Sequence, residues 1–218
     1  MKLCYIFILF FILSNSQLYS QPETIEFRHM DKASGLDQPF PFHMIQDQNG
    51  FIWIAGQNGL WRYSGSQFKH FYHIANDSNS LSYDFIWRIL EDRKGNIWSG
   101  TYGGGLSKYD PRKNLFTNYS YNENDPESIS NDKIRGLEED KDGNIWVGTN
   151  KGLNKLNIST GKFERFSLDD GLSSMVIRDL KLSEDEKMLF VCTAEGLNIL
   201  ELETNTFKVI DTSLPKGY

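Results

Sequence analysis

The chain has 218 residues, of which 39% are apolar and 14% aromatic, with 18 Gly and 6 Pro. This length is sufficient for a sizeable core, and the composition excludes disordered and collagen-like chains while suiting short strands joined by tight turns. The formal net charge of −6 disfavours nucleic acid as a partner, because phosphate binding requires a basic surface.

The first 20 residues have the pattern of a secretory signal peptide. Lys2 precedes an apolar run from Leu3 to Leu13, and polar residues follow. A membrane anchor is the weaker alternative, because a spanning helix needs about 20 apolar residues. We expect cleavage before Gln21 and a mature chain in the periplasm or outside the cell. Its single cysteine, Cys192, leaves no internal disulfide.

One sequence unit occurs four times along the rest of the chain. Each copy has an Asp-x-x-Gly turn or its remnant, an apolar segment with a central aromatic residue, a Gly-Leu pair and an aromatic segment. The equivalent aromatic residues, 45, 48 and 44 positions apart, are Trp53, Trp98, Trp146 and Phe190. The glycines of the pairs are Gly59, Gly105, Gly152 and Gly196. This spacing is in the range of β-propeller blades.

Each unit contains four short β-prone runs, which in the first copy lie at about 41–47, 51–55, 60–64 and 67–71. The unit is therefore predicted to be a four-stranded antiparallel blade, with Asp-x-x-Gly as the first hairpin turn. The repeated aromatic residues are interpreted as buried core rather than as sugar-stacking groups, because they lie mid-strand between apolar neighbours. Trp61 and Trp87 lie outside the repeated position and are freer to be functional.

The predicted fold class is all-β, with four consecutive blades of an incomplete propeller. Residues 21–33 match the end of a repeat and are expected to be an outer strand that closes a missing last blade. A fifth repeat is expected to begin at 212–218, so we expect the chain alone to self-associate. The predicted segments are 1–20 signal peptide, 34–78 blade 1, 79–126 blade 2, 127–169 blade 3 and 170–211 blade 4.

The combined motif resembles the two-component regulator propeller repeat: an Asp-x-x-Gly turn, then Ile-Trp-Val-Gly-Thr, then Gly-Leu. Copies two and three match almost fully, at Asp92 and at Asp140. Copy one departs at Ala55 and Gln57, and copy four lacks the Trp and the turn Gly, so its first hairpin is expected to be distorted.

The resemblance implies a seven-bladed propeller in the periplasmic sensor region of a regulator anchored in the inner membrane, often a hybrid histidine kinase. It implies an oligosaccharide ligand. As further partners it implies the missing blades and signalling domains of a longer protein, and a second copy of that protein in a homodimer. No cofactor is implied. No residue of this chain matches a phosphotransfer motif.

In a propeller, the connections after the second strand and those between blades share one face. On that face we expect a glycan to contact aromatic and amide groups. The candidates, of which Tyr102, Asn58 and Asn150 lead, are Gln57, Asn58, Tyr102, Asn150, Lys151 and Glu195. Ordinary turn residues are the alternative interpretation at each position.

The sequence shows no catalytic triad, phosphate loop or metal motif. His70 and His73 are three apart on a strand end, which places them on opposite faces and disfavours a metal site. A non-catalytic ligand sensor is therefore the favoured function. The alternatives are a protein-interaction scaffold and, less favoured, a propeller polysaccharide lyase.

Overall fold

The structure is a computed structural model that describes residues 27, 29–37 and 40–210. The expected signal peptide at 1–20 and the expected fifth repeat at 212–218 lie outside the described residues, as does most of segment 21–33. The chain divides into two compact units, Met1–Met30 and Asp31–Tyr218, and the sheets belong to the second. Among the described residues, no helix has the length and apolar character needed to cross a membrane.

The described part of the chain forms four antiparallel sheets, each with its four strands in chain order. The first sheet consists of β1 (Pro41–Gln46), β2 (Ile52–Gly56), β3 (Gly59–Tyr63) and β4 (Phe68–Phe71). The second consists of β5 (Ile86–Glu91), β6 (Ile97–Thr101), β7 (Leu106–Asp110) and β8 (Leu115–Tyr119). The third consists of β9 (Ile134–Glu139), β10 (Ile145–Thr149), β11 (Gly152–Asn157) and β12 (Lys162–Phe166). The fourth consists of β13 (Ile177–Leu182), β14 (Met188–Thr193), β15 (Gly196–Glu201) and β16 (Thr206–Ile210).

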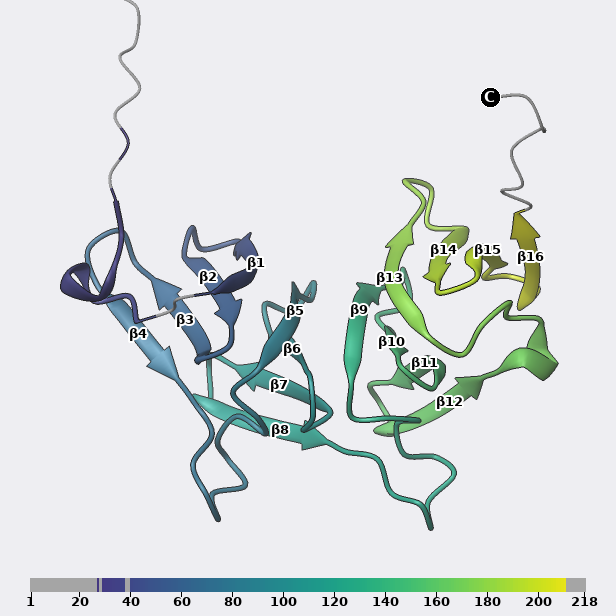
Figure 1. The fold of residues 1–218 in the computed structure, drawn as a ribbon, viewed down its shortest axis with the longest axis horizontal. Helices are drawn as coiled ribbons and strands as arrows, with labels where there is room; N and C mark the ends of the chain where they lie inside the picture. The colour runs from purple at the N-terminus through teal and green to yellow at the C-terminus, as the bar shows by residue number, and fades with distance from the viewer. Residues whose placement is uncertain (1–26, 28, 38–39, 211–218) are drawn as a thin grey trace, which may run out of the picture. The chain divides into compact units, whose positions relative to one another are not determined.

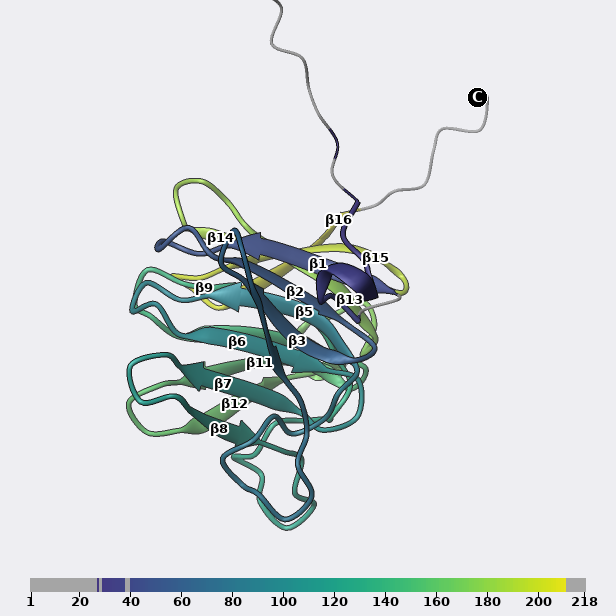
Figure 2. The ribbon, with the colours of Figure 1, turned by 90° about the vertical axis from the view of Figure 1, so that its left-hand side faces the viewer.

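The sheets are blades that follow one another, and the first strand of each packs against the first strand of the next (Figure 1). We call β1, β5, β9 and β13 the inner strands. Figure 2 shows the strands of one blade stacked in sequence, from β5 to β8. The predicted all-β class is confirmed, and the row of blades is open, since no described strand of the fourth sheet pairs with the first. The seven-blade count stays a prediction.

The Asp of each complete turn motif holds its hairpin together. In the third blade, Oδ1 of Asp140 accepts the backbone N–H groups of Asp142 and Asn144, and Oδ2 accepts Nε1 of Trp146 at 3.0 Å. Asp47 and Asp92 make the same bonds in the first two blades. The motif is thus a turn that also satisfies the one polar atom of a buried Trp, which would otherwise be costly to bury.

Each repeated Trp fills the interface with the following blade. Trp53, Trp98 and Trp146 are each at most 1% exposed, and each packs with apolar residues of the next sheet. Burying one such ring removes about 150–250 Å² from water, and this contact joins the blades.

Phe190 departs from the expectation of a buried residue, because its side chain is only partly covered. It pairs with Ile199 on β15 as the tryptophans pair with β3, β7 and β11, so its register is equivalent. The Trp face of a blade is covered by the next blade, and among the described residues no sheet follows the fourth. The distortion expected at this blade's first hairpin is one extra residue in the turn. The amide of Ser183 donates to the carbonyl oxygen of Met188, whereas in the third blade the amide of Asp140 donates to the carbonyl oxygen of Asn144, which is one residue nearer in the chain.

The repeated Gly-Leu glycines lie at or just before the start of the third strands, with backbone angles in the left-handed region. Gly59, Gly105, Gly152 and Gly196 have φ values of 80°, 77°, 104° and 127°. At the first three, a Cβ would also collide with a backbone carbonyl oxygen at the end of the blade's outer strand. Both constraints explain why glycine recurs there.

The segment before the first blade has the geometry of the linker before the fourth. Asp31 and Ser167 each form a capping box on a short 3-10 helix, Lys32–Ser34 and Leu168–Asp170, and each helix ends at a glycine with positive φ. The chain thus enters these two blades by the same local structure. Whether residues 21–33 complete another blade stays a prediction.

Candidate functional site

The turns after the second strands and the linkers between blades meet on one face, which we call the rim. The amide of Gly105 in the second blade donates to the carbonyl oxygen of Asp132 in the following linker. The amide of Tyr102 donates to the carbonyl oxygen of Phe85, just before β5. Equivalent bonds occur in the neighbouring blades, for example from Asn150 to Lys133. Backbone bonds therefore tie the turns of the rim to its linkers.

Every inner strand carries a β-bulge at its second residue, beside the rim. The pairing register shifts between the first and third residues of β1, β5, β9 and β13. A bulged residue has no pairing partner, and bulges commonly re-aim side chains next to functional sites. The bulged residues are Phe42, Trp87, Arg135 and Arg178.

The type of side chain at the bulge changes from blade to blade, whereas the residue just before the bulge is nearly constant. The residues that precede the bulge are Pro41, Ile86, Ile134 and Ile177, and the last three are buried. Two further positions next to the bulge also vary: Phe40, Phe85, Lys133 and Val176 before it, and Gln57, Tyr102, Asn150 and Ala194 on the turn. Variation at these rim positions marks a surface that the fold itself does not require, as on the binding faces of repeat proteins.

The bulged residues of adjacent blades contact one another. The rings of Phe42 and Trp87 stack with centroids 5.0 Å apart, and Phe85 lies 5.1 Å from Phe42. The Tyr102 ring lies 5.5 Å from that of Phe85. Phe42 is 38% exposed, so the cluster presents aromatic surface to solvent. Phe40, two residues before Phe42, is 58% exposed.

Two cations adjoin the aromatic cluster on the side of the third blade. The Arg135 guanidinium lies 4.4 Å from the Trp87 ring centroid and 4.9 Å from that of Tyr102. Lys133 Nζ lies 5.2 Å from the Tyr102 centroid. These cation–π contacts hold both side chains on the rim.

Further along the inner strands, charged groups of different blades pair with each other. Arg88 on β5 forms an ion pair of 3.3 Å with Asp179 on β13, and Lys181 pairs with Glu138 at 3.1 Å. Burial raises the pKa of Glu138, and Lys181 opposes this shift. Burial, followed by the charge of Arg88, lowers the pKa of His43, whose Nδ1 lies 3.4 Å from the Ile89 amide.

The structure separates the six sequence-predicted ligand residues. Tyr102 is within the aromatic and cationic cluster, and Asn150 adjoins it through the bond from its amide to Lys133. Gln57 occupies the equivalent position of the first blade and is exposed. Lys151 lies 5.9 Å from the Tyr121 ring, and Glu195 is exposed on the turn of the fourth blade. These placements do not test the predicted ligand role.

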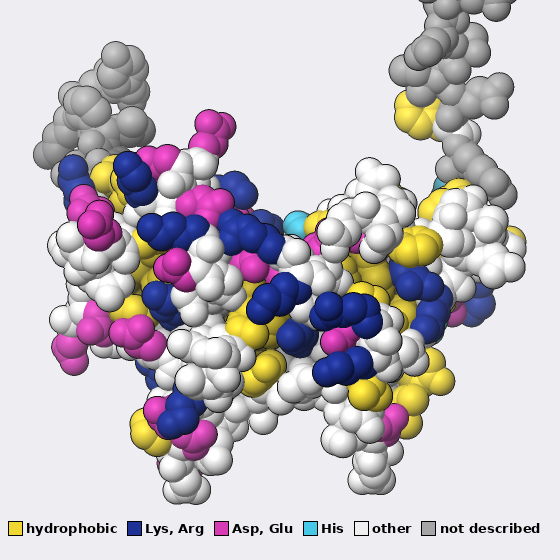
Figure 3. All heavy atoms as spheres, turned by 180° about the vertical axis from the view of Figure 1, so that it is seen from behind, with side chains coloured by type: hydrophobic (Ala, Val, Ile, Leu, Met, Phe, Trp, Pro, Cys, Tyr) yellow, Lys and Arg dark blue, Asp and Glu magenta, His cyan; other side chains and the backbone are white. Residues whose placement is uncertain are grey.

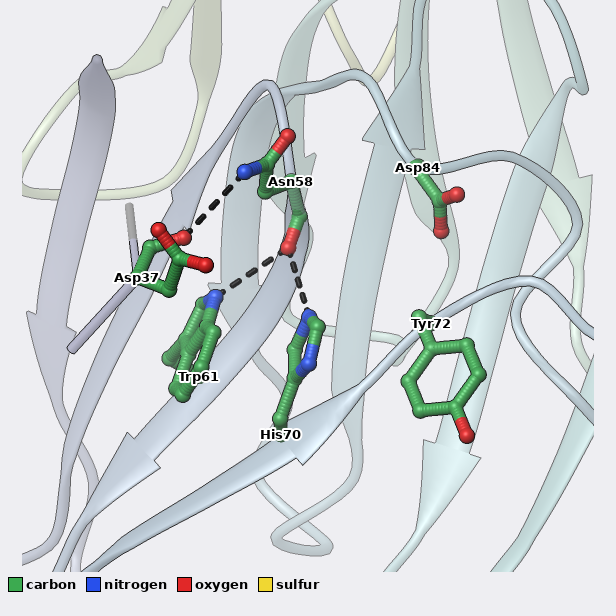
Figure 4. A pocket seen from close by; sticks show the side chains of 6 residues that line it. All are labelled: Asp37, Asn58, Trp61, His70, Tyr72 and Asp84. Carbon is green, nitrogen blue, oxygen red and sulfur yellow. Dashed lines mark hydrogen bonds between the residues drawn. The ribbon is translucent and has the colours of Figure 1, made fainter. Parts of the chain in front are cut away.

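Asn58 lies in a separate open hollow of about 260 Å³ on the first blade, which Figure 4 shows. Its carbonyl oxygen is 3.1 Å from Nε1 of Trp61 and 2.7 Å from Nε2 of His70. The Trp61 and His70 rings stack at 3.9 Å. Tyr72 and the carboxylates of Asp37 and Asp84 complete the lining. His73 turns elsewhere, with Nδ1 2.9 Å from the Leu81 carbonyl oxygen.

The hollow arises where the first blade departs from the other three. In those blades, the residue equivalent to Trp61 is small and polar and accepts an amide of the incoming linker. Ser107 accepts that of Ser82, Asn154 that of Ser130, and Asn198 that of Ser173. Trp61 makes no such bond among the described residues, and its indole instead lines the hollow and donates to the carbonyl oxygen of Asn58.

Cations also occur on a second face, the one seen from behind in Figure 3, where Lys and Arg side chains lie across the middle. Three cations pair across the strands with the repeated tryptophans: Arg62 with Trp53, Lys108 with Trp98 and Lys155 with Trp146. All three lie over the rings of these tryptophans. They recur in register and so belong to the blade itself rather than to a variable surface.

Comparison with known proteins agrees with this repeat geometry. A family described as the two component regulator propeller matches residues 80–103 and 128–151. Each match runs from a linker through the inner strand, the Asp-x-x-Gly turn and the Trp strand to the rim. The chain contains two-component regulator propeller repeats. The family predicted from the repeat motif is therefore confirmed.

Solved structures show the same arrangement. The chain is similar to a protein described as the extracellular domain of a hybrid two-component system from B. thetaiotaomicron, with 26% identity, a TM-score of 0.76, and coverage of 84% of this chain and 26% of that one. A second such domain from the same organism has 21% identity, a TM-score of 0.67, and coverage of 78% and 25%. Virginiamycin B lyase from Staphylococcus aureus, with 14% identity, a TM-score of 0.60, and coverage of 80% and 57%, shares the fold alone.

The chain thus spans about a quarter of the length of the two extracellular domains that it matches. A comparison with curated proteins gives no match.

Sequence reasoning placed Tyr102 on the rim but did not select Phe42, Phe85 or Arg135. The repeat itself offered a way to find them, because the type of side chain at these positions differs between copies that agree in their turn motif and Gly-Leu pair. Their neighbourhood depends on the bulges and on blade packing, which the repeat pattern by itself does not reveal. Trp87, which the repeat pattern leaves freer to be functional, lies at the centre of the cluster.

Proposed function

We propose that this chain is part of an extracytoplasmic, non-catalytic sensor region of a two-component regulator, and that its rim binds an oligosaccharide. The observation that carries the proposal is the aromatic cluster of Phe42, Phe85, Trp87 and Tyr102 on the variable side of the repeats. Flat, partly exposed rings with nearby amides match the apolar faces and hydroxyl groups of sugars.

Two further observations support an extracytoplasmic sensor. The N-terminal sequence has the signal peptide pattern, and a similar structure with 26% identity is an extracellular domain of a hybrid two-component system. In the parent protein, ligand binding at the rim would have to favour one arrangement of the blades or of the subunits in order to signal.

The test is binding of the purified chain to an array of defined oligosaccharides, followed by titration calorimetry with each glycan that binds. Trp87→Ala should weaken binding by tenfold or more, on the order of the energy of one desolvated aromatic contact. Leu115→Ala, at an exposed residue of β8 outside the rim, is the matched control and should leave the affinity unchanged.

Two results would contradict the proposal. Capture of a folded protein partner through the rim, with no glycan bound, would support the interaction scaffold. Cleavage of a bound polysaccharide, abolished by a substitution on the rim, would support a lyase.

A further inference from the structure

The side chains of the rim change from aromatic to cationic along the row of blades. In the first two blades the bulge and its neighbours supply aromatic rings, namely Phe40, Phe42, Phe85, Trp87 and Tyr102. In the third and fourth blades the equivalent positions supply the cations Lys133, Arg135 and Arg178. A ligand that lies across the second and third blades therefore meets an apolar platform at one end and positive charge at the other.

These three cations lack a carboxylate partner within the described part of the chain, although the chain is acidic overall. Two basic groups further along the inner strands are paired, Arg88 with Asp179 and Lys181 with Glu138. Nε of Arg135 is also buried without a hydrogen-bond partner. A buried donor that is left unused costs free energy, so this guanidinium is held in place at a cost to stability.

The blade architecture does not require a cation at the bulge. Arg62 is also stacked on aromatic rings and has a buried, unpartnered Nε. It differs from Arg135 because it lies on the strand opposite the repeated Trp, at a position that holds Lys108 in the second blade and Lys155 in the third. Arg135 instead occupies a position that holds Phe42 in the first blade and Trp87 in the second. Its charge is a local feature of this rim.

We propose that the rim recognises an acidic oligosaccharide, with sugar rings on the exposed surface of Phe42 and a carboxylate or sulfate group at Arg135 and Lys133. The proposal rests on the proposed glycan function and names its ligand class. A guanidinium binds a carboxylate or a sulfate through parallel N–H donors. Stacking on Trp87 and Tyr102 leaves the edge of its plane for that purpose, apart from a 3.5 Å bond from Nη2 to the Tyr102 hydroxyl. Lys133 adds a second charge beside it.

The test uses the purified chain and an array that holds neutral, carboxylated and sulfated oligosaccharides of matched length. Acidic members should bind, and their affinity should fall as ionic strength rises, because the contact is between partly exposed charges. The carboxylated and sulfated members show which acid is preferred.

Variants then connect the binding to the assigned residues. Arg135→Gln should weaken binding of the acidic glycan by about tenfold or more. Arg135→Lys keeps the charge and should recover part of the affinity. Arg62→Gln removes a similarly stacked guanidinium outside the rim and should leave binding unchanged. Thermal melting of each variant checks that the fold is retained.

The outcomes separate this inference from the function on which it rests. Binding confined to neutral glycans overturns the acidic ligand and leaves the glycan sensor standing. Acidic binding that Arg135→Gln leaves unchanged overturns the assignment of Arg135. Absence of any glycan binding rejects both proposals.

Discussion

Nε1 of Trp146 donates a hydrogen bond of 3.0 Å to Oδ2 of Asp140, six residues earlier on the other side of the hairpin turn. The same pair occurs as Trp53 with Asp47 and as Trp98 with Asp92. The two most recognisable residues of the repeat therefore form one unit, in which the carboxylate that shapes the turn also makes the burial of the indole possible.

Replacement of this carboxylate should destabilise the blade. Asp140→Ala leaves Trp146 Nε1 and two backbone N–H groups without their acceptor, and Asp140 itself is only 3% exposed. We expect a loss of about 2–4 kcal/mol in the free energy of unfolding, measured by urea titration. Asp142→Ala, at an exposed position of the same turn, should change it by less than about 0.5 kcal/mol. Equal losses would contradict the role of the pair.

The Gly-Leu glycine should resist substitution for two separable reasons. Gly105 and Gly161 have similar φ values of 77° and 74°, but only at Gly105 would a Cβ collide with the backbone, at the carbonyl oxygen of Tyr119. Gly161→Ala measures the backbone strain alone, about 1–2 kcal/mol. Gly105→Ala should cost on the order of 4 kcal/mol by thermal or urea unfolding, and a cost no greater than the control would show that the strand yields.

The bond between linker and blade should contribute to stability in the third blade. Asn154 is fully buried, and its Oδ1 accepts the Ser130 amide at 2.8 Å. Asn154→Ala leaves that buried amide unpaired and should lower the free energy of unfolding by about 1–3 kcal/mol. Asn124→Ala, on the exposed part of the same linker, serves as the control and should have little effect.

His43 should make the stability of the chain depend on pH. Burial and the nearby charge of Arg88 lower its pKa from the ordinary value of 6.5, so the folded state favours the neutral imidazole. The unfolded chain then binds more protons than the folded one in the range just below pH 6.5, and the free energy of unfolding rises with pH across that range.

His43→Gln removes this titration while keeping a polar side chain near the Ile89 amide. Urea unfolding at several pH values should give a smaller slope below pH 6.5 for the variant than for the wild type. Identical slopes would show that His43 is not responsible. His73→Gln, which removes an exposed imidazole from the first linker, is the matched control.

Much of the architecture could be predicted from the sequence because its determinants are close together in the chain. The Asp-x-x-Gly turn, the Trp six residues after its Asp and the Gly-Leu pair all act within one hairpin, so their spacing indicates the strands directly. Four copies in register then predicted four blades. The partial exposure of Phe190 was missed because its cover depends on a following blade rather than on its own strand.

The sequence by itself determined the blade, its turns, the three buried tryptophans and the type of repeat. The tertiary structure alone decided which rim residues meet. Phe42, Trp87 and Arg135 are separated by 45 and 48 positions, and they come together because each inner strand bulges at the same place and packs against the next. The same holds for the hollow at Trp61, whose lining comes from the segment before β1, a turn, two strands and the linker after β4. Hairpins form from local bonds, whereas a site shared by several blades exists only after the blades have packed together.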